Sequence, residues 1–190
     1  MRRLWLFLAA VLLCASYAAA EQLTAGNLLV ATPKSQDPDL SRSVILLIHC
    51  DRDGAIGLML NRPSEVPLRD VMPELKNAKA PVFAGGPVTI GVRALLKSSS
   101  KPDQAPHLFA DVSVISTKST LEKLIAAHTP PNVFRVYAGY TGWTLGQLQD
   151  EVNRGLWQVL PGDAGVIFDP APKKLWDRLT AAAKNSRQQW

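Results

Sequence analysis

The sequence predicts an α+β fold with a mainly antiparallel sheet, because hairpin-forming segments come first, helical segments come later, and short connections join them. The 190 residues are 47% hydrophobic and 19% charged, a balance that excludes a disordered tail and a polytopic membrane protein. No repeat or long linker divides residues 21–190. We therefore expect a single domain there, large enough to bury a core without disulfide or metal.

The first 20 residues predict a secretory signal peptide. Arg2 and Arg3 precede an apolar run from Leu4 to Leu13, and Ala18-Ala19-Ala20 offers small residues for cleavage before Glu21. The apolar stretch is short for a transmembrane helix, although a membrane anchor formed by an uncleaved leader is an alternative. We expect an exported protein, periplasmic or secreted, that is cleaved near Ala20 and has no stable membrane insertion afterwards.

Loss of the leader leaves a weak positive charge and a single thiol. Arg2 and Arg3 are 2 of the 21 basic residues, so 19 remain against 16 acidic residues, a net charge of +3 that does not predict nucleic-acid binding. Cys14 lies in the leader, so the mature chain cannot form an internal disulfide. Cys50 ends an apolar run typical of a strand covered on both faces, which favours a buried, unreactive thiol over a redox role.

The clearest predicted element is an antiparallel hairpin. The apolar runs Ser43 to Cys50 and Ala55 to Asn61 flank Asp51-Arg52-Asp53-Gly54, and an Asp-Gly pair favours a hairpin turn. Alternation along the second run places Ala55 and Met59 on one face of the sheet and Ile56 and Leu58 on the other. Further strands are expected at residues 27–31, 81–84, 93–97, 107–116, 132–140, 156–160 and 165–168.

Helices are expected where capping residues precede apolar periodicity. Ser119-Thr120-Leu121-Glu122 and Thr144-Leu145-Gly146-Gln147 fit the capping-box pattern, and their helices are expected to end near His128 and at Gly155. Residues 67–72 are expected to form one or two helical turns. Asp169-Pro170 is typical of a helix start, which predicts a last helix from there onward.

Three segments carry rare glycine, proline and tryptophan positions: Arg42 to Pro63, Gly85-Gly86-Pro87-Val88, and Gly139-Tyr140-Thr141-Gly142-Trp143 leading to Gly155-Leu156-Trp157. In order, spacing and identity they resemble the AlgH/YqgE family of bacterial proteins. The resemblance covers residues 22–185 and implies a compact domain whose antiparallel strands curl into a pseudo-barrel flanked by helices. It implies no settled biochemical activity. The family's regulatory label suggests a transcriptional regulator, a role that export would exclude.

Two of these segments contain candidate ligand-binding residues. Asn61 and Arg62 follow a strand and offer an amide and a bidentate guanidinium to an anion, although a structural turn before Pro63 would use the same residues. Gly85 and Gly86 could expose backbone amides. They lack the Lys-Ser/Thr pair of a phosphate loop, however, which favours a tight turn.

The third segment places Tyr140, Trp143 and Gln147 around the start of the helix at Thr144. A helix N-terminus attracts anions, and tyrosine and tryptophan keep one hydrogen-bonding group when buried. The same residues fit an aromatic bracket that packs the helix on the sheet. The predicted ligand-binding residues are therefore Asn61, Arg62, Gly85, Gly86, Tyr140, Trp143 and Gln147.

The sequence contains no catalytic or metal-binding pattern. His49, His107 and His128 are scattered without ligand spacing, so we expect no metal and no cofactor. His49 and Asp51 could form an acid–base pair, although a structural histidine is favoured. We predict a non-enzymatic binding or regulatory module for a small anionic ligand or a protein partner. The alternative is a hydrolase that uses His49, Asn61 and Arg62, and the third interpretation is the transcriptional regulator.

Overall fold

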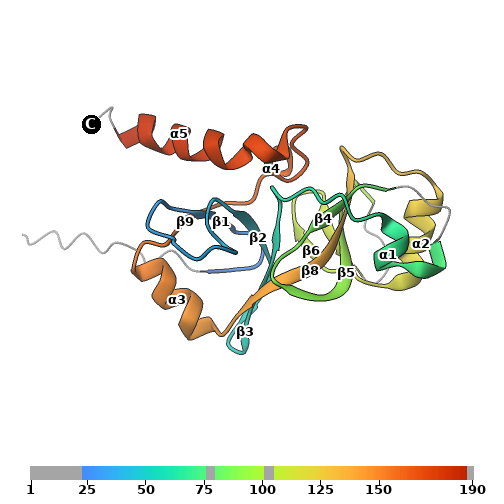
Figure 1. Ribbon diagram of the computed structural model, residues 1–190, viewed down its shortest axis with the longest axis horizontal. Coiled ribbons are helices and arrows are strands. Elements are labelled where there is room, and N and C mark those ends of the chain that lie inside the picture. The colour runs from blue at the N-terminus through green and yellow to red at the C-terminus, as the bar shows by residue number, and fades with distance from the viewer. Residues whose placement is uncertain (1–22, 76–79, 101–104, 188–190) are drawn as a thin grey trace, which may run out of the picture.

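A computed structural model describes residues 23–75, 80–100 and 105–187 (Figure 1). The predicted signal peptide lies outside the described residues. Nine strands form a sheet in the order β6-β7-β5-β8-β3-β2-β1-β9, with antiparallel neighbours throughout, and β4 pairs with β8 in parallel. The predicted α+β class with a mainly antiparallel sheet is therefore confirmed.

The strands are β1 (Leu28–Ala31), β2 (Val44–Asp51), β3 (Gly54–Met59), β4 (Val82–Ala84), β5 (Val88–Lys97), β6 (His107–Phe109), β7 (Val112–Ile115), β8 (Phe134–Trp143) and β9 (Trp157–Leu160). The helices are α1 (Leu68–Val71), α2 (Lys118–Ala126), α3 (Leu145–Asn153), α4 (Ala164–Ile167) and α5 (Leu175–Arg187), with 3-10 turns at η1 (Pro73–Leu75) and η2 (Pro172–Lys174).

The predicted hairpin is confirmed as β2 and β3. Asp51 pairs with Gly54 across the turn, and the Asp51 side chain accepts hydrogen bonds from the backbone N–H groups of Asp53 and Gly54 at 2.8 and 3.2 Å. This local bonding, common for aspartate in turns, fixes the reversal of the chain. The predicted alternation along β3 is also confirmed, because Ala55 and Ile56 pack in different core clusters.

The sheet curls around one core. Val112 of β7 and Leu28 of β1 belong to the same buried cluster, although five strand spacings, roughly 24 Å in a flat sheet, separate their strands. At the two edges, the Phe109 ring of β6 lies so close to Gly162, just after β9, that a Cβ on that glycine would be 2.4 Å from the ring. The edges thus approach through the Phe109 side chain, while no β6–β9 hydrogen-bond pairing closes the described strands into a barrel.

Helices cover the sheet in three places (Figure 1). Leu148 of α3 packs with Trp143 and Trp157 in a second cluster, and Leu121 and Ile125 of α2 pack in a third. The helix α5 lies along β1 at the other side of the sheet from α3. These contacts give each amphipathic helix a buried face, as helical periodicity requires.

Two predicted strands are wrong. Residues 107–116 form a tight hairpin of β6 and β7, because the chain reverses at Ala110, whose φ is +44°. Residues 165–167 lie in α4 and Phe168 is its C-cap, so no strand forms there, because the Asp163 side chain accepts a hydrogen bond from the Val166 N–H at 2.8 Å and caps a helical turn.

The predicted helix starts are partly correct. Thr144 caps α3, and its Oγ1 accepts the Gln147 N–H at 3.2 Å, whereas α2 begins after Thr117 without any side-chain cap, so the capping box at Ser119 is wrong. The last helix starts later than predicted. Asp169 accepts the Ala171 N–H at 2.7 Å, and the η2 turn then separates it from α5.

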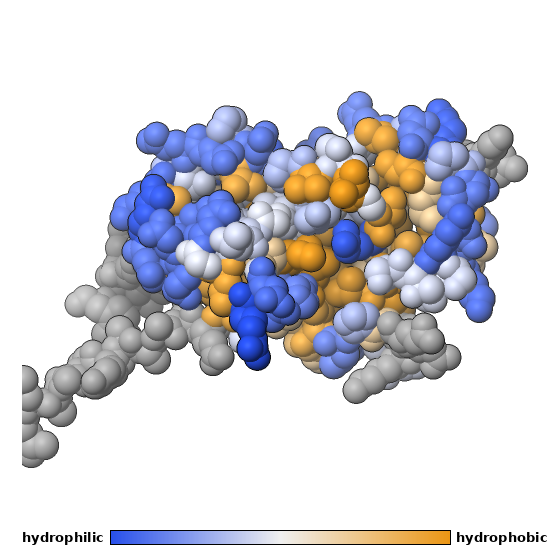
Figure 2. Space-filling view, turned by 90° about the horizontal axis from the view of Figure 1, so that it is seen from below, coloured by the Kyte–Doolittle hydropathy of each residue, from blue (hydrophilic) through white to orange (hydrophobic). Residues whose placement is uncertain are grey.

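The surface combines charged ends with an apolar middle on one face. Figure 2 shows hydrophobic residues gathered over the middle of this face and hydrophilic residues at its two ends. Ile90, on the outward-looping start of β5, is 67% exposed. None of the described helices is long and apolar enough to cross a membrane.

Candidate functional site

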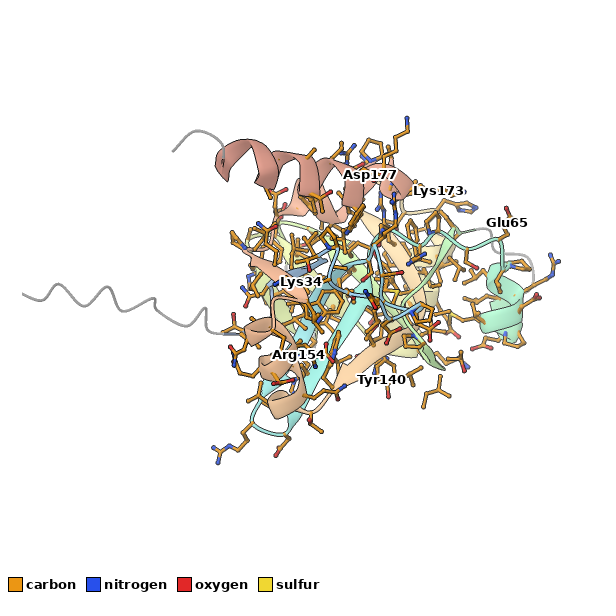
Figure 3. The ribbon with its side chains drawn as sticks, turned by 60° about the vertical axis from the view of Figure 1, so that its left-hand side comes forward. Lys34, Glu65, Tyr140, Arg154, Lys173 and Asp177 are labelled. Atoms are coloured by element: carbon orange, nitrogen blue, oxygen red, sulfur yellow. The ribbon has the colours of Figure 1, made fainter. Side chains whose placement is uncertain are left out.

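Five of the seven predicted ligand-binding residues lie in two pockets at opposite ends of the β2–β3 hairpin, and Gly85 and Gly86 line neither of these pockets. Asn61 and Arg62 line a pocket at the open end together with Lys173, whereas Tyr140, Trp143 and Gln147 line a pocket beside the turn. Figure 3 shows Lys173 and Tyr140 far apart on the molecule. The structure therefore does not bring the predicted residues into one concavity.

The hydrolase interpretation requires His49, Asn61 and Arg62 to surround one substrate, and this separation keeps them apart. His49 lines the pocket beside the turn, while Asn61 bonds to Val44 at the start of β2. Five residues of extended chain, roughly 16 Å, separate Val44 from His49. His49 thus cannot act on the same substrate atom as Asn61 and Arg62.

The pocket beside the turn, which we call the turn pocket, has a volume of about 470 Å³ and includes His49, Asp51, Tyr140 and Gln147. His49 Nε2 lies 2.9 Å from Asp51 Oδ2, so the predicted contact is present, with both side chains about half exposed. The backbone N–H of Asp53, and then the charge of His49, lower the pKa of the Asp51 carboxyl. The Asp51 carboxylate is thus already bonded to the backbone of the turn and to His49.

Glu151 of α3 accepts the hydrogen bonds of Trp143 and Gln147, whose polar groups had made them ligand candidates. Its Oε2 accepts the indole N–H groups of Trp143 at 3.0 Å and Trp157 at 2.8 Å, and its Oε1 accepts the Gln147 amide at 3.2 Å. The two indole rings meet edge to face with centroids 6.0 Å apart. The geometry is that of the aromatic bracket, with α3 fixed to β8 and β9.

The pocket at the open end, which we call the cationic pocket, has a volume of about 570 Å³. Arg42, Arg62 and Lys173 enter it from three separate segments, and none of its described lining residues is a carboxylate. The complete lining consists of Pro38, Ser41, Arg42, Asn61, Arg62, Pro63, Ser64, Ala84, Lys173 and Trp176. Three cationic side chains around one hollow favour an anion there.

Asn61 builds the wall of this pocket from inside the protein. Its Oδ1 accepts the Val44 N–H at 2.9 Å, its Nδ2 donates to the Arg42 carbonyl at 2.8 Å, and only 8% of the residue is exposed. Its amide is therefore already bonded on both sides. The structural interpretation of Asn61 agrees with these contacts.

The two arginines of the cationic pocket are held differently. Arg62 donates through Nη2 to the Ser41 carbonyl at 2.8 Å, and its buried Nε has no hydrogen-bond partner among the described residues. Arg42 is exposed, with its guanidinium 4.4 Å from the centre of the Trp176 ring and 2.8 Å from the Asp177 carboxylate. One cation is thus anchored and the other stacked on an aromatic ring.

Sequence reasoning did not identify Arg42, Lys173 or Trp176 as site residues. Lys173 is exposed, and the turn η2 places it beside the open end of the hairpin. Only the packing of α5 against β1 brings these segments together. The sequence does contain one signal of this site, because Arg42 directly precedes the hairpin and Arg62 directly follows it.

Residues 28–187 match the sequence profile of the AlgH-like family. The chain belongs to this family. It is 34% identical over 171 residues to a UPF0301 protein of Streptomyces avermitilis, covering 84% of this chain and 86% of that protein. It is 38% identical over 168 residues to a UPF0301 protein of Thermobifida fusca, covering 81% and 84%. These names state no activity.

Two solved structures have a similar fold. The solution structure of the AlgH protein from Pseudomonas aeruginosa superposes with a TM-score of 0.66 at 30% identity, covering 84% of this chain and 87% of that one. A crystal structure of a protein from Corynebacterium diphtheriae gives a TM-score of 0.69 at 24% identity, covering 83% and 86%. The resemblance drawn from the three sequence segments is confirmed.

The glycine motif of this AlgH-like chain serves backbone packing. A Cβ on Gly85 would lie 2.2 Å from the Gly139 carbonyl oxygen, and the Gly85 N–H donates to the Ala138 carbonyl at 2.7 Å. A Cβ on Gly86 would lie 2.3 Å from the backbone of Tyr140. The two glycines therefore let two stretches of backbone touch, and the Gly85 amide is not free for a ligand.

The thiol and the histidines of this AlgH-like chain form no reactive cluster among the described residues. Cys50 is half-buried, its thiol lies 3.5 Å from the Leu23 carbonyl, and burial raises its pKa. The thiol is therefore less buried than predicted, and its environment disfavours the thiolate. In the described part of the chain, no three histidine, cysteine, aspartate or glutamate side chains gather closely enough to hold a metal ion.

Proposed function

We propose that this AlgH-like protein binds a small anion, a carboxylate or a phosphate, in the cationic pocket. The observation that carries the proposal is the convergence of Arg42, Arg62 and Lys173 on one pocket with no lining carboxylate among the described residues. A guanidinium group can donate two parallel hydrogen bonds to a carboxylate or to a phosphate, and lysine adds a mobile positive charge. The volume of about 570 Å³ lies in the range of small-molecule sites.

The chemistry of the pocket favours binding over turnover. Its lining contains arginine, lysine, serine and asparagine side chains but no histidine, carboxylate, cysteine or tyrosine. Histidine, carboxylate, cysteine and tyrosine side chains are the common general acids and bases of protein sites. We therefore propose a non-enzymatic binding module.

Calorimetric titration with inorganic phosphate and with butyrate tests this proposal. Lys173→Gln should weaken binding severalfold, and raised salt should weaken it further because the site is solvent-exposed. Lys174→Gln is the matched control, since Lys174 is an exposed neighbour that does not line the pocket. It should leave affinity unchanged.

Arg62→Gln should cost about tenfold or more in affinity, because a hydrogen bond to a charged group is lost. Thermal unfolding of the same variant shows whether the bond to the Ser41 carbonyl also stabilises the fold. The proposal fails if the unmodified protein binds neither anion at about 10 mM, or if Lys173→Gln and Lys174→Gln behave alike.

We also propose that binding takes place outside the cytoplasm, on the strength of the leader pattern in residues 1–20. Fractionation of producing cells, with mass spectrometry of the mature N-terminus, should find the protein exported and starting at Glu21. An uncleaved protein in the cytoplasm would contradict export and would leave the proposal of anion binding unaffected.

A further inference from the structure

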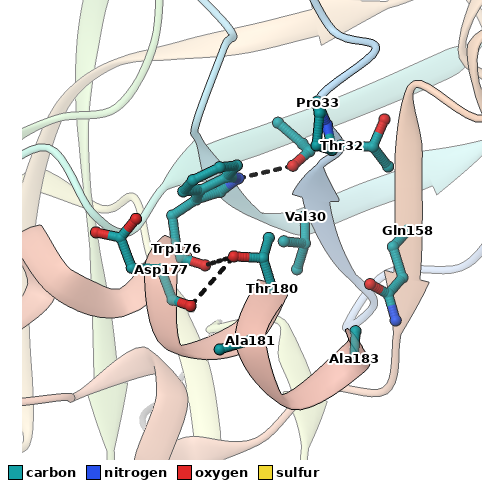
Figure 4. Close-up of a pocket in the computed structure, with 10 residues that line it drawn as sticks. Val30, Thr32, Pro33, Gln158, Trp176, Asp177, Thr180, Ala181 and Ala183 are labelled. Atoms are coloured by element: carbon teal, nitrogen blue, oxygen red, sulfur yellow. Dashed lines mark hydrogen bonds between the residues drawn. The ribbon is translucent and has the colours of Figure 1, made fainter. Parts of the chain in front are cut away.

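A groove under α5, which we call the α5 groove, adjoins the cationic pocket. It has a volume of about 330 Å³ and lies between α5 and the strands β1 and β9 (Figure 4). Its lining is Val30, Ala31, Thr32, Pro33, Gln158, Trp176, Asp177, Thr180, Ala181 and Ala183. Six of these ten residues are apolar, and no lysine or arginine is among them.

Trp176 is the shared wall of the two hollows. It lines both, and its indole N–H donates to the Ala31 carbonyl at 2.6 Å, which holds the ring between them. Figure 4 shows the ring at one end of the groove, with Val30 and Ala181 further along it. The apolar hollow therefore starts where the cationic one ends.

The boundary between the two hollows is a weak ion pair. Arg42 lines the cationic pocket and Asp177 lines the α5 groove, with 2.8 Å between their charged atoms. Both side chains are more than half exposed, at 63% and 56%, so solvent screens this pair. A ligand anion can take the place of the Asp177 carboxylate on Arg42 at little cost.

We propose that the ligand is a single-chain amphiphile with an anionic head, of the fatty-acid type. The head lies in the cationic pocket near Arg42, Arg62 and Lys173, and the hydrocarbon chain lies in the α5 groove. This inference rests on the proposed function and names its ligand class. Charge complementarity selects the anionic head, and the adjoining apolar lining selects the chain.

Calorimetric titration of the full-length protein with butyrate, hexanoate and octanoate tests the role of the chain. Affinity should rise about fourfold for each methylene that enters the groove. Octyltrimethylammonium, with a chain one carbon longer than that of octanoate and a positive head, should not bind. Octyl phosphate shows whether the head site prefers a carboxylate or a phosphate.

A matched pair of variants on α5 tests the location of the chain. Ala181→Glu puts a charge on the groove wall, whereas Ala182→Glu puts the same charge on an exposed neighbour outside the groove. The ratio of octanoate to butyrate affinity should fall about tenfold in the first variant and stay unchanged in the second. Both alanines are exposed, so neither change disturbs the core.

The outcomes separate the two proposals. Equal affinity for butyrate and octanoate, with Arg62→Gln weakening both, overturns the amphiphile and leaves the anion site standing. Chain-length dependence that survives Ala181→Glu overturns the groove as the place of the chain. Absence of binding by every anion overturns both proposals, and tight binding of octyltrimethylammonium overturns the anionic head.

Discussion

Polar side chains gather at both ends of the β2–β3 hairpin, but the protein supplies them with hydrogen-bond and charge partners to different extents. At the turn end, Asp51 bonds to its own turn and to His49, and Glu151 receives two indole N–H groups. At the open end, Arg62 and Lys173 face a hollow without a lining carboxylate among the described residues. A cluster of polar residues indicates a ligand site only when its charges are left unmatched by the protein itself.

Asn61→Ala should have the largest effect on stability. The substitution leaves the Val44 N–H and the Arg42 carbonyl without their partner, which should lower the free energy of unfolding by about 2–4 kcal/mol in urea denaturation. Asn153→Ala, at the exposed end of α3, is the control and should change it by less than about 0.5 kcal/mol. Loss of anion binding with unchanged stability would instead make Asn61 a ligand residue.

Glu151→Ala should follow, at about 1.5–3 kcal/mol, because two indole N–H groups lose a charged acceptor. Tryptophan fluorescence should change in the folded state, since Trp143 and Trp157 become more mobile and more hydrated. Asp150→Ala removes only an exposed pair with Arg154 and should cost less than about 0.5 kcal/mol. A Glu151→Ala protein as stable as Asp150→Ala would refute the bracket.

Thr144→Ala should cost about 1 kcal/mol, the usual value of a lost N-cap. Thr117→Ala tests the same change at α2, where the threonine side chain makes no cap bond, and should be close to neutral. Thermal unfolding of the two variants side by side measures the difference. An equal loss of stability in both variants would mean that the hydrogen bond from the Gln147 N–H to the Thr144 side chain does not stabilise the fold.

Asp51→Asn should have the smallest effect and a defined pH dependence. The folded state lowers the pKa of Asp51 below its ordinary value of 3.8, so the carboxylate stabilises the fold above that pH and loses its contribution as pH falls through the folded pKa. The melting temperature of the variant should therefore lie below that of the unmodified protein at pH 6.5, and the difference should shrink as the pH falls through the folded pKa of Asp51. A difference that persists in acid would assign the effect to geometry.

The sequence predicts local structure well where a few neighbouring residues decide it. The hairpin turn at Asp51 to Gly54 and the Thr144 cap are such cases. The single strand expected at residues 107–116 is wrong because Ala110 adopts a positive φ, which alanine seldom does without tertiary support. Likewise, the apolar residues of α4 fit a short strand equally well, and one capping bond from Asp163 decides the outcome.

The candidate site is less predictable because it depends on distant segments. The position of Arg62 after a strand predicts it as a ligand residue. Lys173 and Trp176 come into the same pocket through the packing of α5, which no local pattern predicts. Sequence also cannot show which polar groups already have a hydrogen-bond partner within the protein. Trp143 and Gln147 resemble ligand residues until Glu151, from the same helix as Gln147, is seen to bond with both.

The pairing of β1 with β9 has a consequence for the order in which the chain acquires its structure. Leu28 pairs with Leu46 on one side and with Leu160 on the other. During synthesis from the N-terminus, β2 reaches β1 early, whereas the opposite edge of β1 stays unpaired until β9 has been made. Pairings between distant segments slow folding, and an open strand edge is a template for association between chains. Arrival of Trp157–Leu160 therefore covers the open edge of β1 and leaves the short strand β9 as the outer strand at this side of the described sheet.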